Sequence, residues 1–467
     1  MTRLRREVPA PPVRMVHLGL GNFFRAHQAW YTHHANQGRP LDEQWGIVAF
    51  SGRSTDVVEA MRAQDGLYTL LVDGADSATP EVVASVVDVR AGADLDAWHR
   101  YLADPEVRIL TTTVTEAGYL RGADGGLDLR HEEVRADVQS WASGDRNSLT
   151  TAPVRIASGL AARRDAGAGP LAVVPCDNLP GNGAVARAVV MGAAEQLDAA
   201  LPAWIDAHVS FVTTAVDRIT PRPTPADQQR VTELTGVEDP AVVVTEPFAE
   251  WDLAGDFPGG RPAWDEVGAV VTDDVRPYET RKLWLLNGAH SLLAYAGSIR
   301  GHETVADAMG DPEVAGWVQQ WWDVALPHLE LPHEELRAYT QALTLRFRNP
   351  RIRHLLAQIA ADGSQKIPVR ILPALRATLT RDGDGDGDGA ADVDGALRVI
   401  ASWVLHTRGA GAPLVDSARP DVLDAVRGTL EEAVLRVLEG WDLDVRLAGR
   451  VLELAAEVGG QEDGHRS

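Results

Sequence analysis

The sequence has very little cysteine and no long apolar run. Cys176 is the single cysteine among 467 residues, so the chain cannot form an intrachain disulfide or a zinc site built from paired cysteines. No run of about 18 uninterrupted apolar residues exists, which excludes a helical membrane span. The first residues are basic but lack an apolar segment, so we expect no signal peptide and a cytoplasmic protein.

Positive charge is also scarce. Lys and Arg total 44 against 67 Asp and Glu, and the formal net charge is −23. Nucleic acids and anionic membranes both bind proteins through Lys and Arg, so this balance argues against either as a partner. It does not exclude a small anionic substrate, because a few cationic side chains at the binding site are enough to bind one. The 45% hydrophobic fraction is that of an ordinary globular protein.

Strand-like and helix-like segments alternate in the first half of the chain. Strands are predicted at 15–20, 45–50, 107–114, 171–176, 209–216 and 241–245, with helices such as 25–36 and 184–206 between them. This alternation predicts an α/β fold with a mostly parallel sheet. Later segments read as helices, at 278–299, 313–328, 334–347, 352–362, 396–406, 422–438 and 445–458. We therefore expect one α/β domain over residues 1–272 and a mostly α-helical domain over 273–467.

A glycine-containing loop follows the first predicted strand. Gly19 and Gly21 form G-x-G, but Phe24 occupies the place of the third glycine in the Rossmann spacing. Backbone N–H groups at such a strand–turn–helix junction bind pyrophosphate, and Arg25 adds a cation. A tight turn without a ligand would also explain the glycines.

The end of the second predicted strand bears on the choice of nucleotide. An acid there favours the free 2′-hydroxyl of NAD, whereas an arginine can hold the 2′-phosphate of NADP. The sequence supplies both Arg53 and Asp56, so spacing alone leaves NAD and NADP open.

Lys282, Asn287 and His290 lie on one predicted helix. At about 100° per residue, Asn287 lies about 140° and His290 about 80° around the helix from Lys282, so all three can line one side. A desolvated lysine can exchange a proton with a hydroxyl, and an asparagine amide can donate to a developing alkoxide. A buried structural network would explain the same three polar residues.

Further polar residues follow other predicted strands. Asn178 lies in CDNLPGNG, Glu116 in TVTEAGY and Asp217 in VDRITP. Ligands bind at the carboxyl ends of strands in such sheets. Turn formation by the asparagine cluster and helix capping by the acids are the simpler explanations.

These segments together resemble one enzyme family. GLGNFFRAHQA, TVTEAGY, CDNLPGNG, VDRITP, TEPFAEW and the Lys-x4-Asn-x2-His pattern occur in the order typical of the polyol-specific long-chain dehydrogenases, the mannitol dehydrogenase family. The resemblance implies an N-terminal Rossmann-type doubly wound domain, a largely helical C-terminal domain and a metal-independent reaction linked to NAD. It also implies a monomer.

The resemblance also implies a role for individual residues. Lys282 resembles the general acid/base, Asn178 and Asn287 the pair that stabilises the alkoxide, and His290 a group that positions the substrate. Asp217 matches an acid of the substrate region. Further substrate contacts are expected from Arg346 and Lys366. Residues expected to bind the cofactor are Gly19, Gly21, Asn22, Phe23, Arg25, Asp56 and Glu116.

Within that family the sequence looks most similar to fructuronate reductases, also called D-mannonate oxidoreductases. We therefore expect reversible reduction of D-fructuronate to D-mannonate. A carboxylate-bearing substrate would need a cation, for which Arg346, Lys366 and Arg370 are candidates. Mannitol 2-dehydrogenase, tagaturonate reductase or another ketose or polyol enzyme of the family is the alternative. A nucleotide sensor without catalysis and an interaction protein are the rival classes.

Two features depart from the family pattern. Phe24 stands where the family often has histidine. Residues 381–395 form an acidic, glycine-rich run that lacks the acid an EF-hand needs at its twelfth position. We interpret this run as an inserted surface loop.

Overall fold

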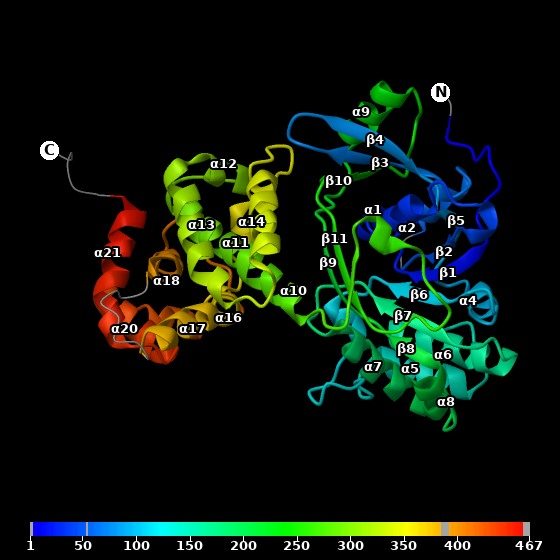
Figure 1. Cartoon of the computed structure of the whole chain (residues 1–467). Coiled ribbons are helices and arrows are strands. Elements are labelled where there is room, and N and C mark those ends of the chain that lie inside the picture. The colour runs from blue at the N-terminus through cyan, green and yellow to red at the C-terminus, as the bar shows by residue number, and fades with distance from the viewer. Residues whose placement is uncertain (1–2, 53–54, 384–391, 461–467) are drawn as a thin grey trace. The chain divides into compact units, whose positions relative to one another are not determined.

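The computed structural model describes residues 3–52, 55–383 and 392–460 (Figure 1). The chain divides into two compact units between Arg276 and Pro277, and each unit is described by itself. Arg53 and residues 384–391 of the acidic run lie outside the described residues. None of the helices in the described ranges combines the length and apolarity needed to cross a membrane.

Six parallel strands form the main sheet of the first unit, in the order β5-β2-β1-β6-β7-β8. They are β1 (Val13–Leu18), β2 (Gly46–Phe50), β5 (Val86–Arg90), β6 (Ile109–Thr112), β7 (Leu171–Pro175) and β8 (Val209–Phe211). Counted along the chain within this sheet, the order is that of a Rossmann fold. The predicted α/β class is confirmed.

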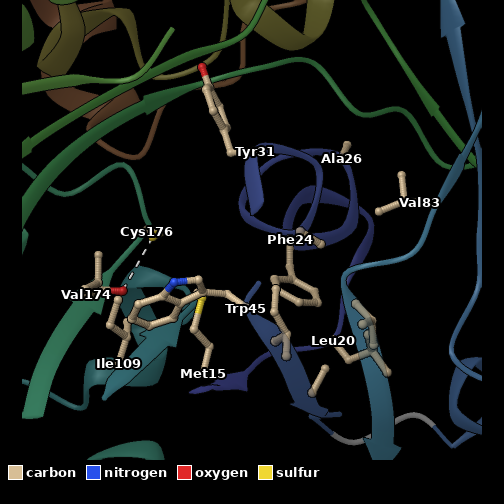
Figure 2. Packing of buried hydrophobic residues seen from close by; sticks show 14 of the residues in the cluster. Met15, Leu20, Phe24, Ala26, Tyr31, Trp45, Val83, Ile109, Val174 and Cys176 are labelled. Atoms are coloured by element: carbon tan, nitrogen blue, oxygen red, sulfur yellow. Dashed lines mark hydrogen bonds between the residues drawn. The ribbon is translucent and has the colours of Figure 1, made fainter. Parts of the chain in front are cut away.

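Helices cover both faces of this sheet because successive strand residues point to opposite sides. Met15 and Ile47 pack in one buried cluster, which Figure 2 shows in part, whereas their neighbours Val16 and Val48 pack in another. The first cluster includes side chains from α1 (Asn22–Ala26), α2 (Gln28–Asn36) and α3 (Asp56–Arg62). The second includes side chains from α4 (Leu95–Leu102), α5 (Glu132–Ala142), α6 (Ala152–Ala166), α7 (Asn182–Leu197) and α8 (Leu201–His208).

Two three-stranded sheets complete the first unit. One has the order β10-β3-β4, and the other β12-β11-β9. Their strands are β3 (Tyr68–Asp73), β4 (Ala78–Val83), β9 (Thr213–Asp217), β10 (Val243–Thr245), β11 (Glu250–Ala254) and β12 (Val270–Thr272). The single strand predicted at 209–216 is wrong. It is two strands that belong to different sheets, because β8 pairs with β7 whereas β9 pairs with β11.

The described part of the second unit is helical, as predicted. Its first long helix changes type along its length: α10 (Arg276–Arg281), the π-helical η4 (Lys282–Gly288), α11 (Ala289–Leu292) and the π-helical η5 (Leu293–Gly297). The following helices are α12 (Val305–Gly310), α13 (Pro312–Ala325), α14 (His333–Phe347), α15 (Leu356–Ile359), α16 (Gly363–Arg370), α17 (Leu372–Gly383), α18 (Asp394–Thr407), α19 (Arg419–Ala425), α20 (Leu430–Gly440) and α21 (Ala448–Gly459).

The helix predicted at 422–438 is interrupted. Gly428 has φ +81°, and Thr429 then starts α20 with a capping box closed by Glu432. A capping box satisfies backbone donors that the start of a helix leaves unpaired. The segment is therefore two helices, α19 and α20, rather than one.

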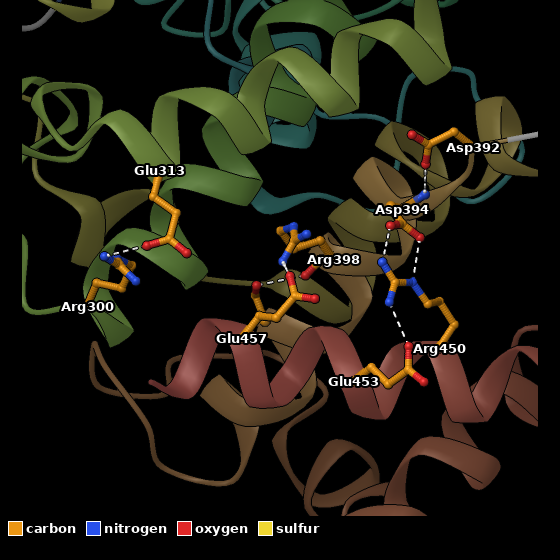
Figure 3. Close-up of polar contacts among 9 residues, drawn as sticks. Arg300, Glu313, Asp392, Asp394, Arg398, Arg450, Glu453 and Glu457 are labelled. Carbon is orange, nitrogen blue, oxygen red and sulfur yellow. Dashed lines mark hydrogen bonds and ion pairs between the residues drawn. The ribbon is translucent and has the colours of Figure 1, made fainter. Parts of the chain in front are cut away.

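Ion pairs link the helices of this unit (Figure 3). Arg398 on α18 pairs with Glu457 on α21 at 2.7 Å, and Arg450 Nε lies 2.8 Å from Asp394. Both pairs tie the first turns of α18 to α21, one near the start of α21 and the other near its end.

Asp311 caps the start of α13. Its carboxylate accepts hydrogen bonds from the backbone N–H of Glu313 at 3.0 Å and from Arg300 at 2.8 Å. Burial by itself raises the pKa of Asp311, but hydrogen bonds from His302 and Arg300 outweigh it and lower that pKa to about 2.

Candidate active site

A cavity of about 650 Å³ lies where β1, β6 and β7 of the main sheet end. Six of the residues predicted to bind cofactor or substrate line it: Gly19, Gly21, Asn22, Phe23, Glu116 and Asn178. Sequence reasoning missed the other lining residues: Leu20, Ser51, Gly52, Thr113, Val114, Thr115, Cys176, Asp177 and Leu179. The carboxyl edge of a Rossmann sheet is where dinucleotides bind.

Gly19 makes the close turn at the base of this cavity. Its φ is +117°, and a Cβ placed there would lie 2.8 Å from the carbonyl oxygen of Thr113. Gly21 differs, because a Cβ there would meet nothing closer than 3.7 Å. The first glycine is thus required by the fold, whereas the second keeps the backbone open toward the cavity.

His17 and Phe24 support the loop from below. The His17 ring is fully buried, stacks on Phe24 at 3.5 Å, and lies within hydrogen-bond distance of Thr111 Oγ1 (2.8 Å) and Gly19 O (3.0 Å). Burial lowers the pKa of His17 to about 3, so the ring is neutral. Phe24, the departure noted from sequence, is therefore a stacking partner that holds the turn.

Arg25 does not line the cavity. Its guanidinium is buried and donates to the carbonyl oxygens of Gly21 (3.3 Å) and Ala241 (2.5 Å) and to Asn22 Oδ1 (2.7 Å). Arg25 thus braces the loop, in place of the direct phosphate contact we expected. Asp56, which starts α3, is exposed and is also absent from the lining.

The asparagine cluster after β7 has two parts with different roles. Asn182 is fully buried, and its amide exchanges hydrogen bonds with the Thr214 backbone at 2.8 and 3.0 Å, which ties α7 to β9. Asn178 faces the cavity. Next to it, Asp177 accepts a short hydrogen bond from the Tyr119 hydroxyl, and burial raises the pKa of Asp177.

Asp217 ends β9 and is 8% exposed, opposite Glu250 in the register of the strands. The next residue, Arg218, is buried with its guanidinium 4.4 Å above the Trp30 ring. Arg218 also donates to the Ala26 and Glu246 carbonyl oxygens at 2.5 and 3.2 Å. The arginine is therefore structural, and Asp217 remains the functional candidate of this strand end.

In the second unit, Lys282 and Asn287 lie on a π-helix. This corrects the geometry predicted for an α-helix, because a π-helical turn closes from residue i to residue i+5. Lys282 and Asn287 are five residues apart and both belong to η4, so they stack on one side instead of diverging by about 140°. Single π-helical turns occur frequently at functional sites.

Two tryptophans of α13 stabilise this π-helix. Trp321 Nε1 donates to the Trp284 carbonyl oxygen and Trp322 Nε1 to that of Leu285, both at 2.9 Å. A Cβ on Gly288 would lie 2.6 Å from Trp321 Nε1. Gly288 thus makes room for an indole.

His290 is 8% exposed and packs against two rings. Its ring centroid lies 4.9 Å from Phe347 and 5.0 Å from His354. Burial and the charge of Arg346 lower the pKa of His354. His354, which sequence reasoning did not select, thus packs against His290 and is exposed to the charge of Arg346.

Lys366 and Arg370 lie on α16, which packs against η4. The Lys366 ammonium donates to the carbonyl oxygens of Ile359 (3.2 Å) and Ala361 (2.5 Å). Arg370 Nη1 donates to Asn287 O (3.3 Å) and Ser291 Oγ (3.2 Å). Of the two cations, Arg370 is the one that touches the Lys–Asn–His helix.

Comparison with known proteins identifies the family. Residues 13–266 match the mannitol dehydrogenase Rossmann domain, and residues 274–415 match the mannitol dehydrogenase C-terminal domain. The chain belongs to the mannitol dehydrogenase family.

This mannitol dehydrogenase family member has relatives with several substrates. It is 37% identical to the D-mannonate oxidoreductase of Escherichia coli K12, over 85% of this chain and 80% of that enzyme. A D-sorbitol dehydrogenase structure superposes with a TM-score of 0.86 at 29% identity, covering 97% of this chain and 98% of that one. The Pseudomonas fluorescens mannitol 2-dehydrogenase ternary complex with NAD and D-mannitol gives 0.71 at 32% identity, covering 96% and 91%. The chain is thus an oxidoreductase that acts on CH–OH groups.

One feature of the sequence of this family member indicates which of its basic residues can transfer a proton. Lys282 and Lys366 are the only lysines, so almost all of the 44 Lys and Arg residues are arginine. A lysine amine can lose its proton at moderate pH, whereas a guanidinium cannot. Lysine is therefore the basic residue type suited to proton transfer here.

Proposed function

We propose that this protein reversibly reduces D-fructuronate to D-mannonate with NADH. The observation that carries the proposal is the pairing of Lys282 and Asn287 on one side of the π-helical η4. On this proposal one substrate oxygen meets both the amine of Lys282 and the amide of Asn287. Similarity to a D-mannonate oxidoreductase favours this substrate within the family.

The cavity of the first unit fits a dinucleotide. It lies at the carboxyl ends of the parallel strands, and the turn at Gly19 is so tight that a Cβ would fill it. Gly21, Asn22 and Phe23 would hold the pyrophosphate through the start of α1. When bound, the nicotinamide donates or accepts the hydride.

The side chains perform the acid–base part of the reaction. Lys282 donates a proton to the ketone oxygen during reduction and removes it from the hydroxyl during oxidation. The amides of Asn178 and Asn287 donate hydrogen bonds to that oxygen as negative charge develops. His290 positions a neighbouring hydroxyl, and Asp217, Arg346 and Lys366 contact the rest of the sugar.

The test is turnover of D-fructuronate and, in parallel, of D-fructose by wild type and by Lys282→Ala. Removing a general acid costs typically about 10²–10⁴ in rate, so we expect that loss in kcat for Lys282→Ala with unchanged NADH affinity by fluorescence titration. Wild-type turnover in this variant would refute the role of Lys282. Lys282→Arg keeps the charge, but a guanidinium does not lose its proton at moderate pH, so this variant should be as inactive as Lys282→Ala.

The competing function is that of a mannitol 2-dehydrogenase, which the similarity to the complex with D-mannitol favours. Preference for D-fructose over D-fructuronate in the same assay would select it and leave the Lys282 mechanism intact.

A further inference from the structure

Arg370 lies beside the proposed catalytic helix without an acidic partner. It is the last residue of α16, half-buried, and its Nη1 hydrogen bonds reach the Asn287 carbonyl oxygen and the Ser291 hydroxyl. Ser291 in turn donates to the same Asn287 carbonyl oxygen at 3.1 Å. The guanidinium is therefore held against the backbone of Asn287, the residue whose amide is proposed to contact the reacting oxygen.

Other buried arginines of this unit are neutralised. Arg281 is 4% exposed and pairs with Glu335 at 2.6 Å, and Arg398 is 3% exposed and pairs with Glu457 at 2.7 Å. Among the described residues Arg370 pairs with no carboxylate, and its Nε and Nη2 donate no hydrogen bond. A guanidinium held in this way can receive an anion through its remaining N–H groups.

Lys366 brings a second positive charge close to Arg370, while Asp362 and Asp416 act on Lys366 in the opposite direction. Burial and the charge of Arg370 are the two main causes that lower the pKa of Lys366. The Lys366 ammonium is already held by two carbonyl oxygens. Arg370 is thus the better placed of the two to bind an anion, and guanidinium geometry matches a carboxylate through two parallel hydrogen bonds.

We propose that Arg370 binds the carboxylate of the substrate and thereby selects a ketose acid over a neutral ketose. The inference rests on the proposed function and names the residue that decides its substrate class. In D-fructuronate four carbon–carbon bonds separate the ketone carbon from the carboxyl carbon, an extended reach of about 5 Å. With the ketone at the Asn287 amide, the proposal puts the carboxylate on the remaining N–H groups of the guanidinium that is hydrogen-bonded to the same residue.

The experiment measures kcat and KM of wild type, Arg370→Ala and Arg370→Lys with D-fructuronate and D-tagaturonate, and with the neutral ketoses D-fructose and D-tagatose. A hydrogen bond to a charged group corresponds to about 10- to 150-fold in affinity, so we expect KM for the acids to rise by that factor in Arg370→Ala. The KM of Arg370→Lys for the acids should lie between those of wild type and Arg370→Ala, because lysine keeps the charge without the paired N–H groups. Added guanidinium should partly restore acid turnover in Arg370→Ala.

Arg337→Ala is the matched control, because Arg337 lies exposed on α14 of the same unit and its loss changes net charge equally. Arg337→Ala should leave kcat and KM unchanged for all four substrates. If Arg370→Ala lowered kcat/KM equally for acids and neutral ketoses, or did not lower it at all, the role of Arg370 would be overturned. A wild type that prefers the neutral ketoses would overturn both this inference and the proposed substrate. Failure of Lys282→Ala to lose turnover would refute the proposed mechanism alone.

Discussion

The turn at Gly19 offers a sharp test of how the cofactor loop is built. Replacing Gly19 by alanine puts a Cβ 2.8 Å from the Thr113 carbonyl oxygen and in contact with its hydroxyl, at a φ of +117°. An unfavourable positive φ costs about 1–3 kcal/mol, and overpacking against backbone costs typically about 1–3 kcal/mol more. We expect Gly19→Ala to destabilise the first unit by about 2–6 kcal/mol.

Gly21→Ala is the matched control within the same G-x-G. Its φ is −114°, and its nearest neighbour would be 3.7 Å away, so the fold should tolerate the methyl group. Calorimetric melting should show a Tm about 5–15 °C lower for Gly19→Ala and a nearly unchanged Tm for Gly21→Ala. NADH fluorescence titration should show lost binding in Gly19→Ala.

The double variant Gly19→Ala/Thr113→Ala separates the two contributions. It removes the hydroxyl but leaves the carbonyl oxygen at 2.8 Å, so it should recover only part of the lost stability. Gly19→Ala protein that melts with wild type and binds NADH normally would refute the reasoning.

Three further predictions concern His17, Asp311 and Gly288. The pKa of His17 is lowered from 6.5 to about 3 by burial, so the folded state binds fewer protons, and stability should fall by about 2 kcal/mol between pH 6.5 and 4.5; urea unfolding of His17→Gln should show a smaller fall. His302 and Arg300 hold the pKa of Asp311 at about 2 despite burial, so Asp311→Ala should cost about 1–2 kcal/mol at pH 7, a cost that denaturation curves should show vanishing as pH falls from 4 to 2. Gly288→Ala would press a methyl group against an indole at 2.6 Å, so kcat should fall while NADH affinity is kept; unchanged kcat would contradict the packing.

The fold followed from sequence where apolar runs are long and fully buried. Strands such as β1 and β2 have this property, so their positions were predicted to within a few residues. The strand β4 was missed because it is half-exposed and carries Pro80, which weakens the strand pattern. Its partner β3 was missed although it is apolar and buried. The split at Val212 was missed because an apolar run does not reveal that its two halves pair with different sheets.

The site was predicted as residue types better than as geometry. Lys282 and Asn287 were both expected on one helix, but their spacing was measured with the α-helical period, and nothing in LWLL signals a π-helix. Arg25 was assigned a ligand because it is basic and follows the glycines; only the fold shows its contact with Ala241, which is 216 residues away. Arg370 was named only as a cation, since its contact with Asn287 depends on how α16 packs.

The π-helical η4 has a consequence for changes in the length of this helix. A π-helical turn holds an additional residue compared with the α-helical turns beside it, so η4 sets the angular phase of Lys282 relative to everything that follows. Deleting one residue between Lys282 and Asn287 would restore α-helical winding with the two residues four apart, about 40° from each other around the helix, so the amine and the amide would stay on one side. A relative one residue shorter there would keep both the residues and their alignment, whereas at the length of this chain it is the π-helical turn that keeps Lys282 and Asn287 on one side.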